Sequence, residues 1–343
     1  MQAVSIIAPA AFAPDQAGQV RHGGDLTSVQ QRFPAAPRPW IDLSTGINPR
    51  PYPIGRVTAE AWTRLPSRDA EHALVEAAAI RYGCRVEQIA IAPGTQALIQ
   101  LLPRLAQPAR VAVLGPTYAE HALCWEREGH HVSTVATLAD AGGADVVVIV
   151  NPDNPTGRLL DPATLHGLDA KLLVIDEAFI DLLPPQASLA ANVPGNAVIL
   201  RSFGKTYGLA GLRLGFAVAS ATLVTRLRAA LGPWAVSGPA LEIADQALRD
   251  DAWLAAARDH LARDSARLEA LLASAGFAIV GRTPLFVLGR HPEAPHLVDR
   301  LARHGIHVRA FEHRPDWIRF GLPGDDGAFS RLAATLQVPQ KVR

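Results

Sequence analysis

The feature that most constrains the fold is a series of short, apolar, β-rich segments that alternate with helical stretches in the middle of the chain. Several of these segments lack polar alternation, which is typical of strands covered on both faces. Such strands, alternating with helices, form a mainly parallel sheet. We therefore predict one large α/β domain over residues 41–231. The segments lie at residues 111–114, 145–150, 172–175, 197–200 and 214–219.

A change of texture after residue 231 points to a second domain. Residues 239–275 are rich in alanine and leucine and favour amphipathic helices, and short β-rich segments and a last helix follow them. This order predicts a smaller C-terminal α+β domain over residues 232–343, with Gly232-Pro233 as a hinge. Residues 1–40 are loop-like and are expected to form an arm near that domain. The β-rich segments lie at 277–280, 285–288, 305–310 and 317–320.

Composition excludes several classes of protein. Of 343 residues, 49% are hydrophobic and 19% charged, which excludes a disordered or fibrous chain. A net charge of +1 with scattered basic residues argues against nucleic acid or anionic lipid as a partner. Cys84 and Cys124 have no metal-site or disulfide spacing. Residues 1–13 are apolar, but no Lys or Arg precedes Arg21, and no apolar run approaches the ~20 residues that span a bilayer. We expect a cytoplasmic protein without a metal.

Lys205 is the first candidate functional residue. It is one of only three lysines and lies in the segment RSFGKTYGLAGLRLGF at 201–216, directly after the predicted strand 197–200. A side chain in this position points into the crevice where α/β proteins bind ligands. A surface turn lysine is the alternative. The glycines nearby allow close approach to a ligand, and Ser202 and Arg213 suit a phosphate, so we interpret Lys205 as functional.

Other polar groups also follow predicted strands. Asp176 ends the strand at 172–175 and either caps a helix or keeps the nitrogen of a pyridine ring protonated. The turn 151–157 (NPDNPTG) presents Asn154 as an amide donor. Gly94-Thr95-Gln96 opens a helix after the segment 89–92, which is a typical anion site. Tyr118 is either an ordinary loop aromatic or a ring that stacks on a ligand.

Taken in order, these residues resemble the motifs of fold type I pyridoxal-phosphate enzymes, in the group of the aspartate and histidinol-phosphate aminotransferases. The resemblance implies a large domain with a mainly parallel seven-stranded sheet, a smaller α+β domain, pyridoxal 5'-phosphate as the cofactor and a homodimer. It implies that Lys205 is the Schiff-base lysine, that Asp176 pairs with the ring nitrogen and that Tyr118 stacks on the ring. Asn154 would bond the ring oxygen. The phosphate would be held by Gly94, Thr95, Gln96, Ser202 and Arg213.

The resemblance also implies an anion-binding substrate site. Arg319, in the motif WIRFG, corresponds to the arginine that grips the substrate's anionic group, and Arg309 resembles a second such arginine. Two departures argue against an ordinary histidinol-phosphate aminotransferase. Phe179 replaces a tyrosine that bonds the ring oxygen in many relatives. Leu65 replaces a tyrosine that reaches the partner subunit's phosphate.

Within the family, the motifs HGGD at 22–25, DLSTGINP at 42–49 and DEAFID at 176–181 resemble the branch that decarboxylates L-threonine O-3-phosphate in cobalamin biosynthesis. They add His22, Gly23 and Asn48 to the substrate-binding candidates, beside Asn154. A histidinol-phosphate-type aminotransferase shares every cofactor residue and is the first alternative. A non-catalytic domain that senses the cofactor is a remote one, because the lysine is intact and no DNA-binding segment is attached.

Overall fold

The apolar segments of the sequence form a seven-stranded sheet in the computed structural model, which describes residues 23–337. The strand order is β2-β8-β7-β6-β5-β3-β4; β8 runs antiparallel to both neighbours and the other pairs are parallel. This confirms the prediction of a mainly parallel sheet. The strands are β2 (Ile89–Ala92), β3 (Arg110–Leu114), β4 (His131–Val135), β5 (Val146–Val150), β6 (Leu172–Asp176), β7 (Ala197–Ser202) and β8 (Gly215–Ala219).

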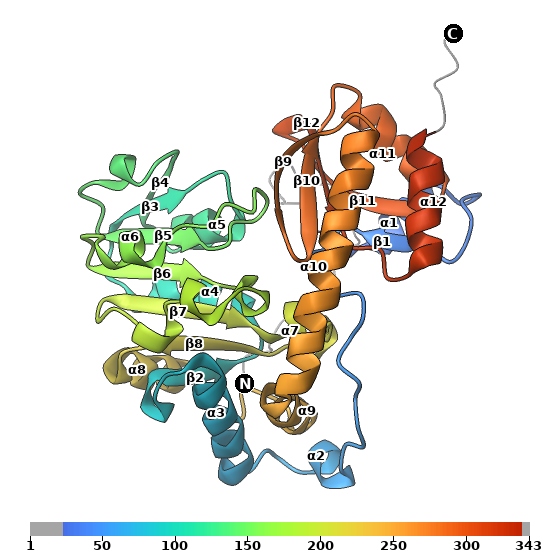
Figure 1. Ribbon diagram of the computed structural model, residues 1–343. Helices are drawn as coiled ribbons and strands as arrows, with labels where there is room; N and C mark the ends of the chain where they lie inside the picture. The colour runs from blue at the N-terminus through green and yellow to red at the C-terminus, as the bar shows by residue number, and fades with distance from the viewer. Residues whose placement is uncertain (1–22, 338–343) are drawn as a thin grey trace, which may run out of the picture.

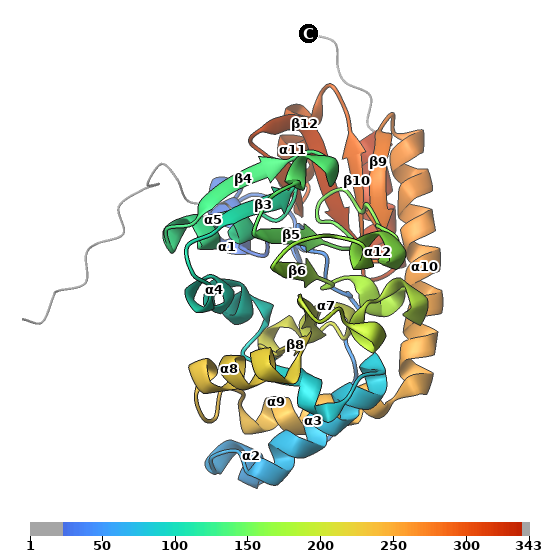
Figure 2. The ribbon, with the colours of Figure 1, turned by 90° about the vertical axis from the view of Figure 1, so that its left-hand side faces the viewer.

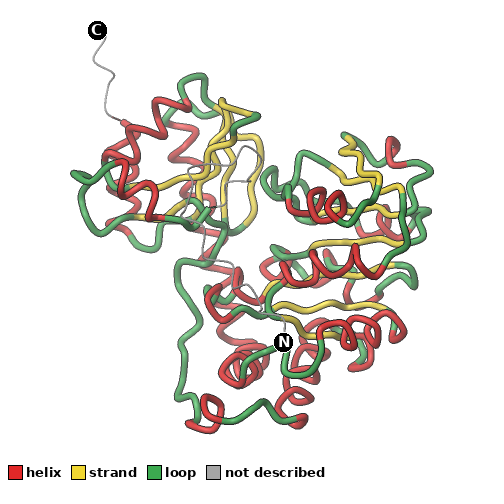
Figure 3. Tube along the Cα trace, turned by 180° about the vertical axis from the view of Figure 1, so that it is seen from behind, coloured by secondary structure: helices red, strands yellow, loops and turns green. Residues whose placement is uncertain are grey.

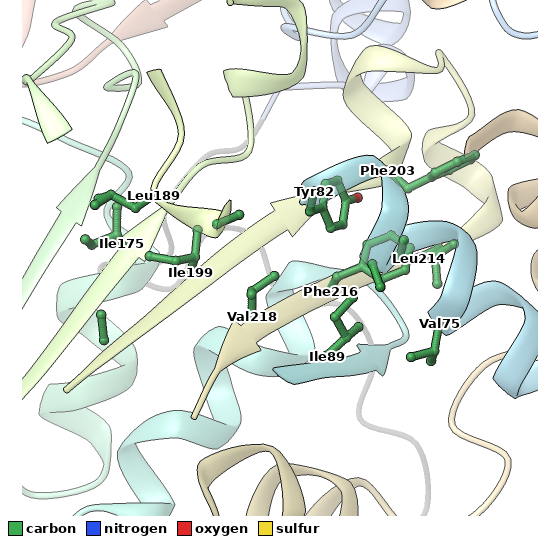
Figure 4. Packing of buried hydrophobic residues seen from close by; sticks show 14 of the residues in the cluster. Val75, Tyr82, Ile89, Ile175, Leu189, Ile199, Phe203, Leu214, Phe216 and Val218 are labelled. Carbon is green, nitrogen blue, oxygen red and sulfur yellow. The ribbon is translucent and has the colours of Figure 1, made fainter. Parts of the chain in front are cut away.

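Both faces of this sheet are buried, which explains the lack of polar alternation. Ile199 and Val218 pack on one side with Val75 of α3, as Figure 4 shows, whereas Leu200 packs on the other side with residues of α4 and α8. The helices associated with this sheet are α3 (Arg68–Tyr82), α4 (Thr95–Leu105), α5 (Glu120–Arg127), α6 (Pro162–His166), α7 (Phe203–Thr206), α8 (Ala221–Leu231) and α9 (Gly238–Arg249).

A second sheet of five strands forms a separate lobe (Figures 1 and 3). Its order is β1-β11-β12-β10-β9, and the long helix α10 extends from α9 to this sheet (Figure 2). The elements of this lobe are β1 (Ile41–Leu43), α10 (Asp251–Ser274), β9 (Ala278–Thr283), β10 (Phe286–Arg290), α11 (Ala294–Arg303), β11 (Ile306–Phe311), β12 (Arg314–Gly321) and α12 (Asp326–Gln337), with α1 (Leu26–Arg32) close by and α2 (Ala59–Thr63) on the other lobe.

The elements that pack into each lobe do not divide at the boundaries predicted from the sequence, which lie after residues 40 and 231. Strand β1, expected in the large domain, pairs with β11 of the second sheet. Helix α9, expected in the small domain, buries Leu241 and Leu248 in the core of the larger sheet. In the expected N-terminal arm, Arg32 binds Asp299 of α11, and the carbonyl of Pro39 accepts from Arg331 of α12. The division into domains itself stays a prediction.

Two strands escaped the sequence pattern. β4 lies at the edge of the larger sheet with mostly exposed side chains, so it lacks an apolar run. β1 has only three residues, too few for a periodic signal. Over residues 23–337, no helix combines the length and the apolar character that a bilayer crossing requires.

Candidate active site

Parallel strands of the larger sheet bring the predicted residues to one edge. Val150, Asp176 and Ser202 end the neighbouring strands β5, β6 and β7, and the register pairs Val150 with Asp176. A pocket of about 280 Å³ lies beyond these ends. Of the residues predicted from the sequence, those that line it are Gly23, Gly94, Thr95, Gln96, Tyr118, Asn154, Asp176, Ser202, Lys205, Arg213 and Arg319.

Asp176 lines the pocket and is only 4% exposed. Oδ1 accepts a hydrogen bond from the backbone of Ala178 at 3.0 Å, and Oδ2 lies 3.0 Å from Nε2 of His121. His121 is 1% exposed and comes from α5. The two bonds hold the carboxylate in one orientation. They also offset the cost of burying its charge, which would be high without partners. No local pattern predicted His121, because its bond to Asp176 joins residues 55 positions apart.

Lys205 follows β7 and borders the same pocket. Burial lowers the pKa of its amine; the charge of Asp176 opposes this shift, whereas Arg319 and Arg213 add to it. Its Nζ lies 5.0 Å from the centre of the Phe179 ring. A lysine with a depressed pKa is more often an unprotonated amine, which is the form that attacks a carbonyl group.

The start of helix α4 provides an anion-binding end of the pocket. Gly94 precedes the helix with a φ of 87°, in the left-handed region that favours glycine. A Cβ at this position would lie 2.6 Å from Nη2 of Arg213, so the guanidinium packs directly on the turn. Ser202 also lines this pocket. Free amide hydrogens at the helix start, a guanidinium and a hydroxyl together suit a phosphate group.

Tyr118 lies on the wall of the pocket. Its ring makes an edge contact with His121, at 6.1 Å between ring centres and 84° between planes, and its hydroxyl donates to Oε1 of Gln96 at 3.3 Å. The side-chain nitrogen of Gln96 donates in turn to Glu120 at 2.8 Å. The side-chain amide of Gln96 is thus engaged within the protein through its oxygen and through one hydrogen of its nitrogen.

Arg319 of β12 forms the charged wall that faces the strand ends. It is 7% exposed, and it donates to the side-chain oxygen of Asn154 and, at 2.8 Å, to the backbone oxygen of Ser44. No carboxylate pairs with it within residues 23–337. Burial and the nearby charge of Arg309 lower its pKa to about 10. A buried guanidinium that faces only neutral oxygens is well suited to an anionic ligand.

Two substrate-binding candidates within residues 23–337 are not among the pocket residues. Asn48 is buried, but its amide donates to the backbone oxygen of Thr206 and accepts from the backbone of Arg50, so it anchors the segment that carries Lys205. Its role as a substrate ligand stays a prediction. Arg309 lies opposite Arg319 in the β11–β12 register, outside the pocket lining. His22 lies outside the described residues.

The two departures from the expected family pattern have different surroundings. Phe179 lines the pocket and packs edge-on against Phe286 of β10, so an apolar ring stands there in place of a hydroxyl. Leu65 is 67% exposed on this chain. Ser44, which the sequence did not single out, lines the pocket and accepts from Arg319 through its backbone oxygen.

The sequence model of the family "Aminotransferase class I and II" matches residues 39–336. The chain belongs to this family. One curated relative is the threonine-phosphate decarboxylase of a Sinorhizobium species. It is 45% identical over 326 residues, which cover 92% of this chain and 97% of the relative. The threonine-phosphate decarboxylase of Pseudomonas aeruginosa is 43% identical over 328 residues, with the same coverage of both chains.

Solved structures of aminotransferases share the fold. The histidinol-phosphate aminotransferase of Sinorhizobium meliloti in complex with pyridoxal-5'-phosphate matches with a TM-score of 0.74 and 23% identity, over 95% of this chain and 97% of that one. The fold of this chain is therefore the fold type I architecture of pyridoxal-phosphate transferases.

Proposed function

We propose that the protein is a pyridoxal-phosphate-dependent decarboxylase that converts L-threonine O-3-phosphate into (R)-1-amino-2-propanol O-2-phosphate and carbon dioxide, as a step of cobalamin biosynthesis. The observation that carries the proposal is one pocket that combines the amine of Lys205, the buried carboxylate of Asp176 and a guanidinium of Arg319 that no carboxylate neutralises within residues 23–337. The relatives named threonine-phosphate decarboxylase support this substrate, because they match nearly the full length of both chains.

The residues present fit the cofactor. Its phosphate would lie at the start of α4, between the amides after Gly94, the Ser202 hydroxyl and the Arg213 guanidinium. Asp176 would hold a proton on the ring nitrogen, Asn154 would donate from its side-chain nitrogen to the ring oxygen, and Lys205 would bind covalently. When bound, the cofactor supplies an electron sink for the bond that breaks at the substrate's Cα.

The arginines would decide which bond breaks. The bond at Cα that stands perpendicular to the cofactor plane breaks fastest, so a decarboxylase must hold the substrate carboxylate in that position. Arg319 binds one anionic group of the substrate from the face of the pocket opposite the strand ends. Arg309, one strand over, lies close enough to depress the pKa of Arg319 and would add its charge to the attraction of a second anion.

Lys205 would also move the proton that completes the reaction. Carbon dioxide leaves with cleavage of the Cα–carboxylate bond, and the electron pair stays on the substrate side. Lys205, released when the substrate's amine takes its place, would carry a proton taken from the substrate's ammonium group and would deliver that proton to Cα. The pKa of its amine, lowered by burial, makes such a transfer easier than from an ordinary lysine.

The decisive experiment is an assay of the purified protein with pyridoxal 5'-phosphate and L-threonine O-3-phosphate. We expect release of carbon dioxide and formation of the amino-propanol phosphate. Unphosphorylated L-threonine is the matched control and should react much more slowly, because it lacks one of the two anions. Conversion of 2-oxoglutarate into glutamate without gas release would instead indicate the histidinol-phosphate-type aminotransferase.

Borohydride reduction of the loaded protein tests the covalent link separately. Peptide mapping should find the reduced cofactor on Lys205, and the Lys205→Ala variant should lose the absorbance band of the lysine-bound cofactor. Lys171→Ala is the matched control, because Lys171 is an exposed lysine paired with Asp145. Cofactor attached to another lysine would contradict the assignment.

We further propose a cytoplasmic homodimer. Ile54, Trp62 and Leu65 are large exposed apolar side chains on or near α2, which favours a protein contact there. Light scattering should give twice the mass of one chain, and Trp62→Glu should shift it toward the monomer. We keep as proposals the arm at residues 1–40, the large domain at 41–231 and the small domain at 232–343.

A further inference from the structure

Glu120 is a buried carboxylate that lies behind the pocket wall carrying Tyr118. It is the first residue of α5 and 8% exposed, and it is not one of the residues that line the pocket. An acidic residue in the first turn stabilises a helix by itself, but such a residue usually stays in solvent. Glu120 instead accepts a hydrogen bond at 2.8 Å from Gln96 of the neighbouring helix α4.

This bond sets the direction of a short chain of hydrogen bonds. A carboxylate only accepts, so the Gln96 amide must turn its nitrogen toward Glu120 and its oxygen toward the pocket. That oxygen lies 3.3 Å from the hydroxyl of Tyr118. Since a carbonyl oxygen also only accepts, the hydroxyl donates. The charge of Glu120 therefore determines the orientation of both groups in front of it.

We propose that Glu120 is a positioning residue, which acts through Gln96 to fix the ring of Tyr118 against the cofactor ring. This rests on the proposed function and on the stacking of Tyr118 on pyridoxal 5'-phosphate that the family resemblance implies. The edge of the Tyr118 ring contacts His121, and its hydroxyl donates to Gln96. Loss of the hydroxyl contact loosens the hold on the ring about its side-chain torsions, so stacking becomes less favourable.

The first test replaces Glu120 by leucine. Glu120→Leu leaves the side-chain nitrogen of Gln96 without this acceptor, so the cofactor-free variant should stay folded and melt modestly below the wild type. Its dissociation constant for pyridoxal 5'-phosphate should rise roughly tenfold, the effect of losing one buried hydrogen bond. The circular dichroism of the bound cofactor should weaken as well. Glu126→Gln, on the exposed side of the same helix, is the matched control and should change neither quantity.

A double-mutant cycle shows whether Glu120 acts through Tyr118. Tyr118→Phe removes the hydroxyl, so adding Glu120→Leu to this variant should weaken cofactor binding no further. Equal weakening in both backgrounds would overturn the proposal, because Glu120 would then act by another route.

A swap of the two side chains provides the rescue. Gln96→Glu alone places two carboxylates against each other and should weaken binding. In the double variant Gln96→Glu, Glu120→Gln, the amide donates from position 120, and the carboxylate at 96 still accepts from Tyr118. Binding should be tighter than in Gln96→Glu alone, because the two carboxylates no longer face each other, and weaker than in the wild type, because the charge at position 96 lies nearer the cofactor phosphate. A double variant as weak as the single one counts against the proposal, even where Glu120→Leu fails to fold.

All these measurements use pyridoxal 5'-phosphate without a substrate. If the wild-type protein does not bind the cofactor, the proposed function itself fails. If the wild type binds and Glu120→Leu binds as tightly, only the positioning role of Glu120 is overturned.

Discussion

Two buried arginines of this protein have opposite surroundings. Arg201 of β7 is 5% exposed and forms ion pairs with Glu177 and Asp181, whereas Arg319 of β12 is 7% exposed and bonds only neutral oxygens of Asn154 and Ser44. Burial lowers the pKa of both guanidinium groups. For Arg201 the charges of Asp181 and Glu177 outweigh this effect and raise the pKa, whereas for Arg319 the positive charge of Arg309 lowers it further.

The difference separates a structural cation from one available to a ligand. Arg201 also lies over the ring of Tyr82 and donates to Ser188, so it joins the ends of β6 and β7 into one unit. Those two ends carry Asp176 and Ser202 into the pocket. Arg319 has no paired carboxylate within residues 23–337; the charge of Asp42 offsets part of its cost of burial, and a bound anion would offset more.

The largest effect on stability is expected from breaking the ion pairs of Arg201. Arg201→Met leaves Glu177 and Asp181 as uncompensated buried charges, so we expect a loss of about 3–5 kcal/mol in the free energy of unfolding. Urea titration of the cofactor-free protein measures this loss. Arg319→Met is the control in the same assay and should cost little stability or raise it, because it removes a buried charge that has no counterion. Equal destabilisation by both variants would refute the contrast between the two arginines.

The next effect concerns catalysis. Arg319→Gln keeps a donor for Asn154 but removes the charge. Loss of a charge-assisted contact with the substrate anion should weaken transition-state binding by about 3 kcal/mol, which lowers kcat/KM roughly a hundredfold or more. Steady-state decarboxylation of L-threonine O-3-phosphate measures it. Arg309→Gln should cost less, because Arg309 lies outside the pocket lining. If Arg309→Gln proves the more damaging change, Arg309 is the main anion-binding arginine.

The sequence predicted well the parts of the site that local patterns determine. Asp176 and Lys205 follow apolar strands, and parallel strands end at one edge, so their proximity followed from topology alone. Gly94 was predictable for a similar reason, because a glycine turn before a helix is a local motif. The same reasoning led to the mainly parallel sheet, whose strands lack polar alternation.

The contacts that escaped prediction join distant segments through side chains. The bond from Arg319 to Ser44 spans 275 positions, and that from His121 to Asp176 spans 55. Neither residue pair has a spacing that reveals it. Asn48 is a related case: its motif suggests a substrate contact, which stays a prediction, and does not reveal that its amide holds the backbone of Thr206. Only the packed chain decides whether a polar group faces a ligand or the protein itself.

The smallest effect tests Lys205 as a third buried cation, intermediate between the two arginines. Asp176 attracts its charge, but burial prevails and lowers its pKa below 10.5. Below the folded-state pKa, the amine is protonated in both states and its full burial cost is present. As the pH rises through that pKa, only the unfolded protein keeps the proton, so the folded state gains stability.

In cofactor-free protein, Lys205→Met should therefore melt above the wild type at pH 7, by a margin that shrinks toward pH 10. Lys171→Met, at an exposed lysine, should show no such trend. A margin independent of pH would mean that Asp176 balances the burial of Lys205 completely, as Glu177 and Asp181 do for Arg201.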